Sequence, residues 1–379
     1  MQREFGLVRK SGPVPCDLVM PQLHIALCYG TRPQTIKASV LRSALGTLAR
    51  VTAVDSGQHY DYALNELLYR QLGIAPADHY LGVGSGSHAT QTSAILLRME
   101  PLLSDLSPDA VAVIGDTNST LGCALAAAKL RIPVVHVEAG LRAHDRLMAE
   151  EINRRATDAI AGLLITPSRA ASERLRRERP DAVVCEAGDV ARDVLISQLA
   201  HLPPLTAVSP LAKAPYIFAT LHRAELVDRP GLLQAVLEEI SQLSVPTVLA
   251  LHPRTRRALD AVASPSAGYG RLKFIPAVGY LESLALTRGA SLVLTDSGGL
   301  QREAYWLGTP CVTLRAETEW AETIELGANT LVAPADVPNR LRDLVAEILG
   351  RSHSGWDRDA YGTGHAAQCA AAATLDWLK

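Results

Sequence analysis

Short apolar runs alternate with helix-length stretches along nearly the whole chain, and this alternation limits the possible fold more than any other feature of the sequence. Continuous apolar runs are typical of strands in a parallel sheet whose two faces are both covered by helices. In the first half the predicted strands are His24–Tyr29, Val51–Val54, Val111–Ile114, Val134–Val137 and Leu163–Thr166. The predicted helices between them are Gln34–Leu48, Tyr60–Leu72, Ala89–Leu103 and Leu121–Leu130.

A proline-containing segment at 201–214 interrupts this pattern, which then starts again. A chain of 379 residues is long enough for two domains. We therefore expect an N-terminal extension at 1–22 and two doubly wound, Rossmann-like domains at 23–205 and 206–379. The last helix is a candidate to pack back on the first domain. The predicted strands of the second half are Tyr216–Leu221, Thr247–Leu251, Leu272–Ile275, Leu292–Thr295, Cys311–Leu314 and Thr330–Val332.

Charge and composition exclude several classes of protein. The 37 Lys and Arg residues nearly balance the 39 Asp and Glu residues, which argues against a nucleic-acid-binding surface. No apolar run approaches the roughly 18 residues of a membrane span, and the N-terminus lacks the apolar core of a secretory signal. The six cysteines form no Cys-x-x-Cys pair, so we expect neither a structural zinc site nor a disulfide framework, and a reducing cytoplasm is the simplest location.

Polar and ionisable residues concentrate directly after the apolar runs, at the carboxyl ends of the predicted strands. These ends meet at one edge of a parallel sheet, which is where open α/β sheets bind their ligands. Because both halves show this concentration, we expect a ligand cleft between the domains, lined by both. The segments concerned include Gly30–Pro33, Gly115–Asn118, Glu138–Arg142, His222–Glu225 and Asp296–Gly299.

The second half offers groups suited to a phosphorylated ligand. Ser297, Gly298 and Gly299 stand between a predicted strand and a predicted helix, where free backbone N–H groups attract anions. Glu303, one turn further on, is placed to accept hydrogen bonds from ribose hydroxyls, or simply to complement the helix dipole. His222 ends a strand and is placed to donate to a phosphate or to exchange a proton, although a histidine there is more often structural. Neither a Walker-type P-loop nor a G-x-G-x-x-G fingerprint follows a strand, which argues against ATPase or NAD-dependent chemistry.

Two cations of the first half, Arg32 and Lys37, are candidates to meet the same phosphates from the other side of the cleft. Arginine suits a planar bidentate contact, and lysine acts as a point charge. Solvated surface cations are an equally simple interpretation.

Three carboxylates of the first half are candidates for proton transfer. Asp116 and Glu138 each end an apolar strand, so we expect partial burial to raise the pKa of both. Glu150 follows in a predicted polar loop. A neighbouring Arg142 or Arg154 would lower the pKa of one carboxyl, so that an acid and a base coexist. The same carboxylates could instead hold Mg²⁺ or Mn²⁺, or act only as caps and ion pairs.

Seven blocks of sequence occur in a distinctive order. They are GTRPQTIK (30–37), GDTNSTLG (115–122), HVEAGLR (136–142), EEINR (150–154), LHRAE (221–225), TDSGGLQREA (295–304) and LGTP (307–310). Together they resemble the non-hydrolysing UDP-N-acetylglucosamine 2-epimerases, from about His24 to the C-terminus. The resemblance implies the GT-B fold, in which two Rossmann-like domains hold a nucleotide sugar in the cleft between them.

The resemblance also implies roles for individual residues. Asp116, Glu138 and Glu150 match the family's acid/base carboxylates, and His222 matches its catalytic histidine near the diphosphate. The residues that match its phosphate, ribose and other substrate contacts are Arg32, Lys37, Ser297, Gly298, Gly299, Glu303 and Arg315.

The implied reaction is the reversible conversion of UDP-N-acetylglucosamine to UDP-N-acetylmannosamine. A base removes the proton at C2 while UDP leaves C1, and the resulting glycal is reprotonated on its opposite face before UDP adds again. The reaction needs no cofactor and no metal, and by analogy we expect a homodimer. The alternatives are a hydrolysing relative that releases UDP and free N-acetylmannosamine, an epimerase of another UDP-2-acetamido sugar, a GT-B glycosyltransferase, or a silent nucleotide-sugar sensor.

Specificity is where this sequence departs from the family pattern. A UDP-2,3-diacetamido uronic acid, for example, carries an extra carboxylate that Arg142, Arg146 or Arg315 could meet. In the uracil-binding region, Val278 and Ser283 replace the Gln and aromatic residue of other members. Recognition of the base would then depend on backbone groups or on a nearby tyrosine, Tyr280.

Overall fold

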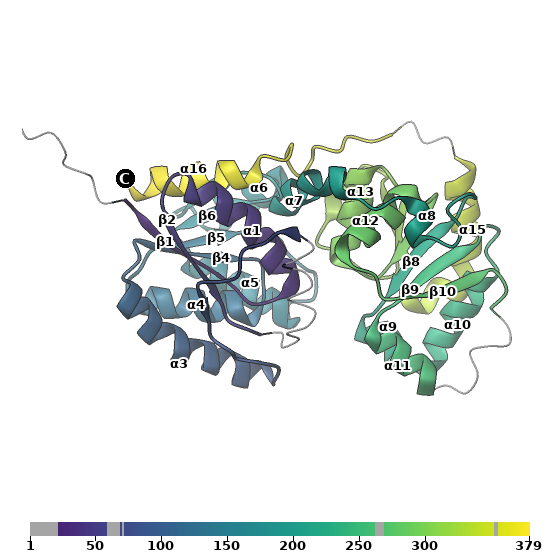
Figure 1. Cartoon of the computed structure of the whole chain (residues 1–379), viewed down its shortest axis with the longest axis horizontal. Helices are drawn as coiled ribbons and strands as arrows, with labels where there is room; N and C mark the ends of the chain where they lie inside the picture. The colour runs from purple at the N-terminus through teal and green to yellow at the C-terminus, as the bar shows by residue number, and fades with distance from the viewer. Residues whose placement is uncertain (1–21, 59–68, 70–71, 262–268, 352–354) are drawn as a thin grey trace, which may run out of the picture.

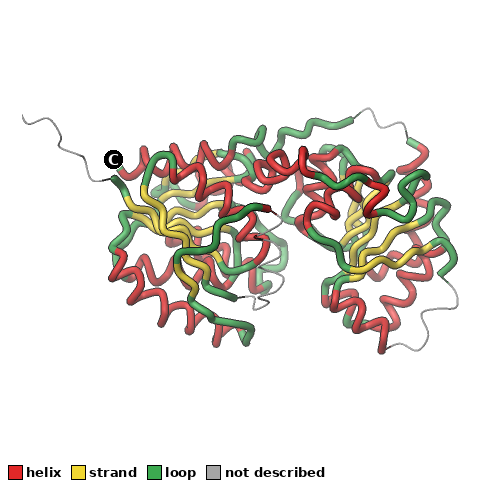
Figure 2. Tube along the Cα trace, viewed as in Figure 1, coloured by secondary structure: helices red, strands yellow, loops and turns green. Residues whose placement is uncertain are grey.

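Each half of the chain forms one parallel α/β sheet in a computed structural model that describes residues 22–58, 69, 72–261, 269–351 and 355–379. Among these residues, the first sheet has seven strands in the order β3-β2-β1-β4-β5-β6-β7, and the second has six in the order β10-β9-β8-β11-β12-β13. Figure 2 shows the two sheets as separate yellow layers flanked by helices. The prediction of two Rossmann-like, doubly wound domains in a GT-B arrangement is confirmed.

The strands of the first sheet are β1 (His24–Tyr29), β2 (Arg50–Asp55), β3 (His79–Tyr80), β4 (Ala110–Ile114), β5 (Val134–Val137), β6 (Leu163–Thr166) and β7 (Val183–Glu186). Those of the second are β8 (Ile217–Leu221), β9 (Thr247–Leu251), β10 (Leu272–Pro276), β11 (Leu292–Thr295), β12 (Cys311–Thr313) and β13 (Asn329–Leu331).

Helices connect successive strands and cover both faces of each sheet (Figure 1). In the first half they are α1 (Arg32–Gly46), α3 (His88–Leu106), α4 (Asn118–Lys129), α5 (Ala149–Ile160), α6 (Arg169–Glu178) and α7 (Val190–Gln198). After these come α8 (Leu205–Val208), α9 (Ala224–Val227), α10 (Pro230–Ser241), α11 (Pro253–Ala261), α12 (Tyr280–Gly289), α13 (Gly298–Leu307), α14 (Ala321–Glu325), α15 (Val337–Gly350) and α16 (Ala366–Leu378).

The central strands are buried on both faces, as their continuous apolar sequences require. Every residue of β1 and of β4 is buried. Alternate residues of β1 contribute to separate cores: Ile25 and Leu27 pack toward α1 and α16, whereas Ala26 packs toward α3 and α4. Burial of both faces fixes the order and register of the strands. Because the strands are parallel, their carboxyl ends lie at one edge of the sheet.

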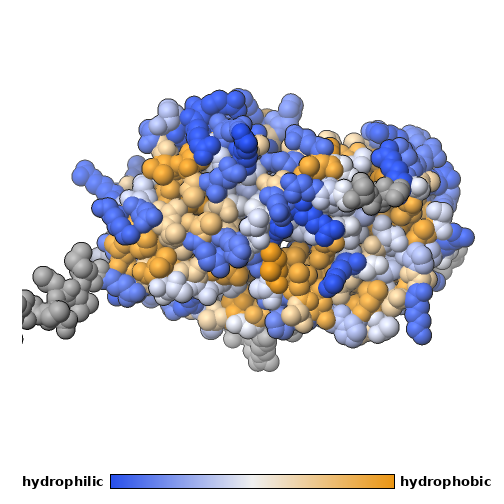
Figure 3. Space-filling model, turned by 90° about the horizontal axis from the view of Figure 1, so that it is seen from above, coloured by the Kyte–Doolittle hydropathy of each residue, from blue (hydrophilic) through white to orange (hydrophobic). Residues whose placement is uncertain are grey.

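The last helix, α16, returns from the second half of the chain and lies on the first domain, against α1 and α7 (Figure 1). Its small alanines, such as Ala370 and Ala371, are buried in the core beneath α1. Its first backbone N–H groups are capped from another helix, because Asp193 of α7 accepts hydrogen bonds from Ala366 (3.1 Å) and Ala367 (2.7 Å). The surface on this side of the molecule mixes apolar and hydrophilic patches (Figure 3).

Some details differ from the sequence prediction. The short edge strands β3 and β7 are additional, since neither is a long apolar run. The helix predicted at Tyr60–Leu72 lies mostly outside the described residues. The segment at 201–214 is not wholly irregular, because it contains α8. No helix among the described residues is both long and apolar enough to cross a membrane.

Candidate active site

Two adjoining cavities lie between the domains, at the carboxyl ends of both sheets. The larger has a volume of about 480 Å³ and is lined from the first domain by Asp116 and Glu138, among others, and from the second by Arg302 and Trp320. The smaller has a volume of about 310 Å³. The cleft expected from the strand ends is therefore present, and the two cavities meet at four shared residues: Pro33, Lys37, Gly299 and Arg302.

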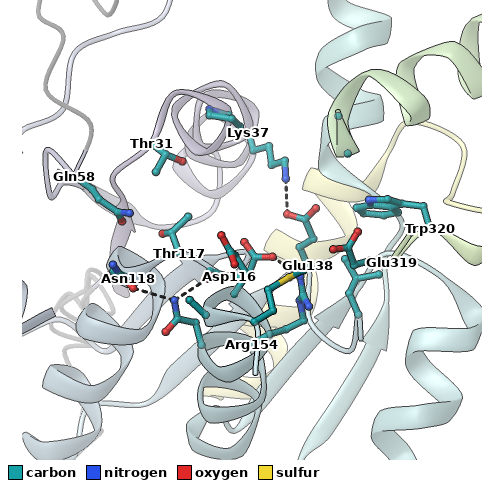
Figure 4. A pocket seen from close by; sticks show the side chains of 18 of the residues that line it. Thr31, Lys37, Gln58, Asp116, Thr117, Asn118, Glu138, Arg154, Glu319 and Trp320 are labelled. Carbon is teal, nitrogen blue, oxygen red and sulfur yellow. Dashed lines mark hydrogen bonds and ion pairs between the residues drawn. The ribbon is translucent and has the colours of Figure 1, made fainter. Parts of the chain in front are cut away.

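Tight backbone turns bring both carboxylates into the larger cavity. Asp116 follows β4 and comes directly after Gly115, which has a φ of +68°. Glu138 follows β5 and itself has a φ of +69°, a left-handed conformation that is unusual for a residue other than glycine. In Figure 4 the two side chains lie close together, between Lys37 and Arg154.

Asp116 keeps a raised pKa. Burial, the largest effect, raises it, and the neighbouring charge of Glu138 raises it further, while an ion pair with Arg154 only partly opposes them. Arg154 is shared, because its Nη1 also donates to Glu151 at 2.6 Å. Asp116 is thus the carboxyl of the larger cavity whose pKa is shifted upward.

Glu138 differs, and the expectation of a raised pKa is wrong for it. Burial alone would raise its pKa, but Lys37 and Arg302 together lower it. Lys37 forms an ion pair with Oε2, and Arg302 Nη1 lies 3.2 Å from Oε1. The pKa values of the two carboxyls are therefore shifted in opposite directions, and Lys37 and Arg302, rather than Arg142, lower that of Glu138.

Glu150 lines the larger cavity from an exposed position. It lies in the first turn of α5 and not in a polar loop as predicted. Its neighbour Glu151 is fully buried and accepts hydrogen bonds from the backbone of Ala143 (2.8 Å) and from Arg155 (2.7 Å). Glu151 therefore stabilises the start of α5, while Glu150 faces the larger cavity.

His222 lines the smaller cavity at the end of β8, beside His252. Its Nδ1 lies 2.9 Å from Oδ1 of the buried Asp296, whose other oxygen accepts the backbone N–H groups of His222 and Arg223, both at 2.8 Å. Burial would raise the pKa of Asp296, but these partners lower it. An ionised Asp296 favours the proton on Nδ1 and leaves Nε2 of His222 for a ligand.

The turn before α13 presents backbone groups to the cleft. Ser297 caps the helix, because its hydroxyl accepts the N–H of Leu300 at 3.3 Å. Gly298 lines the larger cavity and Gly299 lines both, so a phosphate can approach the free N–H groups there. Glu303 lines the smaller cavity, where burial raises its pKa to about 7.

Two predicted contacts lie outside the lining of these cavities. Arg32 is the first residue of α1 and is half-buried. Arg315 is buried and its Nη1 lies 3.1 Å from Glu319, which does line the larger cavity. Arg315 therefore reaches the cavity through Glu319 and not directly.

Sequence reasoning missed several residues that line the larger cavity. Arg154 was considered only as a neighbour of the carboxylates, and Arg302 stood uninterpreted inside the TDSGGLQREA block. Nothing in the sequence marks Trp320 as a cavity residue, since an isolated aromatic residue predicts only a core position. Among the described residues, no group of three or more His, Cys, Asp and Glu side chains is placed to hold a metal ion.

Comparison with known proteins agrees with this geometry. Residues 46–374 match the family described as UDP-N-acetylglucosamine 2-epimerase. The chain is 39% identical to UDP-2,3-diacetamido-2,3-dideoxy-D-glucuronate 2-epimerase of Pseudomonas aeruginosa, covering 91% of this chain and 97% of that protein. It is 36% identical to UDP-N-acetylglucosamine 2-epimerase of Methanocaldococcus jannaschii, with the same coverages. The crystal structure of the M. jannaschii enzyme in complex with UDP-GlcNAc and UDP superposes with a TM-score of 0.82, covering 94% of this chain and 99% of that one.

Proposed function

This chain belongs to the UDP-N-acetylglucosamine 2-epimerase family, and we propose that it inverts C2 of a UDP-2-acetamido sugar, with UDP-N-acetylglucosamine and UDP-N-acetylmannosamine as the first pair. One observation carries the proposal. Asp116 and Glu138 line one cavity, and their pKa values are shifted in opposite directions. Inversion at a carbon centre needs a group that takes a proton from one face and a group that delivers one to the other.

We assign the two roles in the reaction from the directions of these pKa shifts. Glu138, held as a carboxylate, takes the proton from C2 as the C1–O bond to UDP breaks, and a C1=C2 double bond forms. Asp116, whose pKa is shifted upward, serves as the acid: in its protonated form it gives its proton to the opposite face of C2 while a diphosphate oxygen of UDP bonds to C1 again. Glu138 leaves the cycle protonated and Asp116 ionised, and exchange with water restores both.

The second domain and α1 stabilise the departing diphosphate. Lys37 and Gly299 line both cavities, Gly298 lines the larger and His222 lines the smaller, and we assign the donors to the diphosphate to these four residues. Donors that are already in place where negative charge develops lower the barrier without reorganisation. Glu303 in the smaller cavity is the proposed partner of the ribose hydroxyls, and Tyr280, which lines the same cavity, is the proposed partner of the uracil.

NMR of the reaction in D₂O tests this function. UDP-N-acetylglucosamine should give both epimers with deuterium at C2, because Asp116 exchanges its proton with solvent before delivering it. Accumulation of UDP with free N-acetylmannosamine would instead indicate the hydrolysing reaction. Intact substrate without deuterium, in a preparation that binds UDP, would indicate a glycosyltransferase or a sensor and would reject the proposal.

A second candidate substrate is the UDP-2,3-diacetamido-2,3-dideoxy-D-glucuronate named for the P. aeruginosa relative. Two of the arginines considered for its extra carboxylate are already engaged: Arg142 with Asp158 (2.6 Å), and Arg315 with a cavity glutamate. Arg223 lines the larger cavity, and no ion pair with it occurs in the described part of the chain, so we propose Arg223 for this contact. Supplying both sugars in the D₂O assay decides between them by their relative exchange rates.

A further inference from the structure

Arg302 occupies an unusual place at the junction of the two cavities. It extends from α13 of the second domain, and its side chain is largely buried. Its guanidinium forms an ion pair with Asp189, the N-cap of α7, and lies 3.2 Å from Oε1 of Glu138. The group also lies 3.8 Å from the centre of the Trp320 ring, a cation–π arrangement. A cation of one domain is thus held by two carboxylates of the other.

The charges that face Glu138 come from different parts of the molecule. Lys37 of α1 and Arg154 of α5 belong to the same domain as Glu138, and both lower its pKa. Asp116, which follows β4, faces Glu138 and carries the same charge when both are ionised. Arg302 is the facing cation that belongs to the second domain, so its contact with Glu138 depends on the position of that domain.

Building on the proposed function, we infer that Arg302 is a positioning residue through which docking of the two domains holds the C2 base, Glu138, in its ionised form. Asp189 and Trp320 serve this role by fixing the guanidinium in place from the two sides of the cleft. When the domains separate, Glu138 keeps Lys37 but loses its second cation.

The expected size of the pKa shift supports the inference. An opposite charge within about 4–6 Å lowers a carboxyl pKa by roughly 1–3 units, and the effect is greatest where water is excluded. Burial pushes the pKa of Glu138 upward, so its low value depends on the sum of its cations. Removing one of the two direct partners should therefore move the titration of Glu138 measurably and not merely reduce the stability of the protein.

The first experiment uses substrate-free protein and no turnover. The carboxyl carbon of Glu138 is followed by NMR in protein labelled with ¹³C-glutamate, and the signal is assigned by its loss in Glu138→Gln. Arg302→Gln should raise the titration midpoint by about one pH unit or more, and Arg302→Lys by less, since it keeps the charge. Arg288→Gln, an exposed arginine at the end of α12, is the matched control and should leave the midpoint unchanged.

Equal midpoints in the wild type and in Arg302→Gln would overturn the inference. If Arg302→Gln does not fold, Arg302→Met, which keeps the apolar stem without the charge, takes its place and should move the midpoint in the same direction. An unchanged midpoint there would be equally contradictory.

The second experiment separates this role from a purely structural one. The acidic limb of kcat/KM for C2 exchange in D₂O should move to higher pH in Arg302→Gln, so that activity at a fixed pH on that limb falls about tenfold for each pH unit by which the limb moves. Arg302→Lys should restore most of it. A uniform loss at every pH, without rescue by lysine, would show a structural role and reject the inference. Absence of exchange in the wild type would reject the epimerase function itself, whereas the NMR midpoints decide the role of Arg302 in either case.

Discussion

At the scale of single residues, the ionisation of each carboxylate follows from how many cations it shares. Asp116 has one direct cationic partner, Arg154, which Glu151 also engages, and burial prevails. Glu138 has two, and they outweigh the opposing effect of burial. Both residues end buried strands, so their positions alone would give them the same behaviour.

Removing either carboxylate tests the assignment of roles. Glu138→Gln and Asp116→Asn should each lower the rate of C2 exchange by about 10²- to 10⁴-fold, the range of general acid–base catalysis. Binding of UDP, measured by calorimetry, should change little, because most of the proposed nucleotide contacts lie in the other domain. Glu173→Gln, an exposed residue of α6, is the control, and full activity in either carboxylate variant would contradict the mechanism.

Asp296 acts through His222, and its replacement tests that link. Asp296→Asn keeps the shape but offers only one carbonyl oxygen to three donors, so the orientation and tautomer of His222 are lost. Since a hydrogen bond to a charged group is worth about 1.5–3 kcal/mol, kcat should fall roughly 10- to 100-fold. Steady-state kinetics measures this, and a change in KM alone would exclude the proposed orientation of the histidine.

At the scale of elements, the cap of α16 is supplied by a different helix. Asp193 of α7 accepts two N–H groups at the start of α16, which has no side-chain cap of its own. The contact ties the returning C-terminal segment to the first domain, although the two helices are far apart in sequence.

Asp193→Ala should therefore destabilise the protein without touching the cavities. Leaving one buried donor unpaired costs about 1–3 kcal/mol, and this variant leaves two. For a domain of about 150–250 residues, each kcal/mol lowers Tm by about 2–4 °C. Calorimetry of Asp193→Ala beside Asp376→Ala, an exposed residue of the same helix, provides the comparison, and equal Tm values would show that the cap is dispensable.

At the scale of the whole molecule, buried ion pairs make stability depend on pH. Asp158 accepts hydrogen bonds from His136 (2.7 Å) and Arg142 (2.6 Å), and although burial opposes them, these partners lower its pKa. The pKa of Asp296 is lowered as well. In the unfolded chain both titrate near pH 4.

A lowered pKa in the folded state means that the stabilisation is present above pH 4 and is lost as the pH falls through the folded value. Tm should therefore drop steeply below about pH 4, and Asp158→Asn should lower Tm at pH 7 while flattening the acid slope. Glu303, with a raised pKa of about 7, acts in the opposite sense, so the variants must be compared with the wild type at each pH. An acid slope unchanged in Asp158→Asn would contradict this account.

By analogy with the family, we expect this protein to form a homodimer. Light scattering coupled to gel filtration should then report twice the mass of the 40.5 kDa chain. A mass of one chain over the working concentration range would contradict the expectation.

The sequence by itself determined the two parallel sheets and the edge at which their ligand lies, because long apolar runs and helix-length spacing leave few other ways to bury the strands. It also determined that Asp116, Glu138 and His222 stand at that edge, since each closely follows a strand. The sequence did not predict short edge strands such as β3, because two residues are too few to form a recognisable apolar pattern.

Tertiary structure alone decided what these groups can do. The low pKa of Glu138 depends on Lys37, distant in sequence, and on Arg302 from the other domain, and no local pattern contains either contact. The cap of α16 has the same origin in a remote residue, Asp193. Local sequence sets backbone conformation and which face is buried, but the electrostatics of a buried group is a sum over neighbours that only the folded chain brings together.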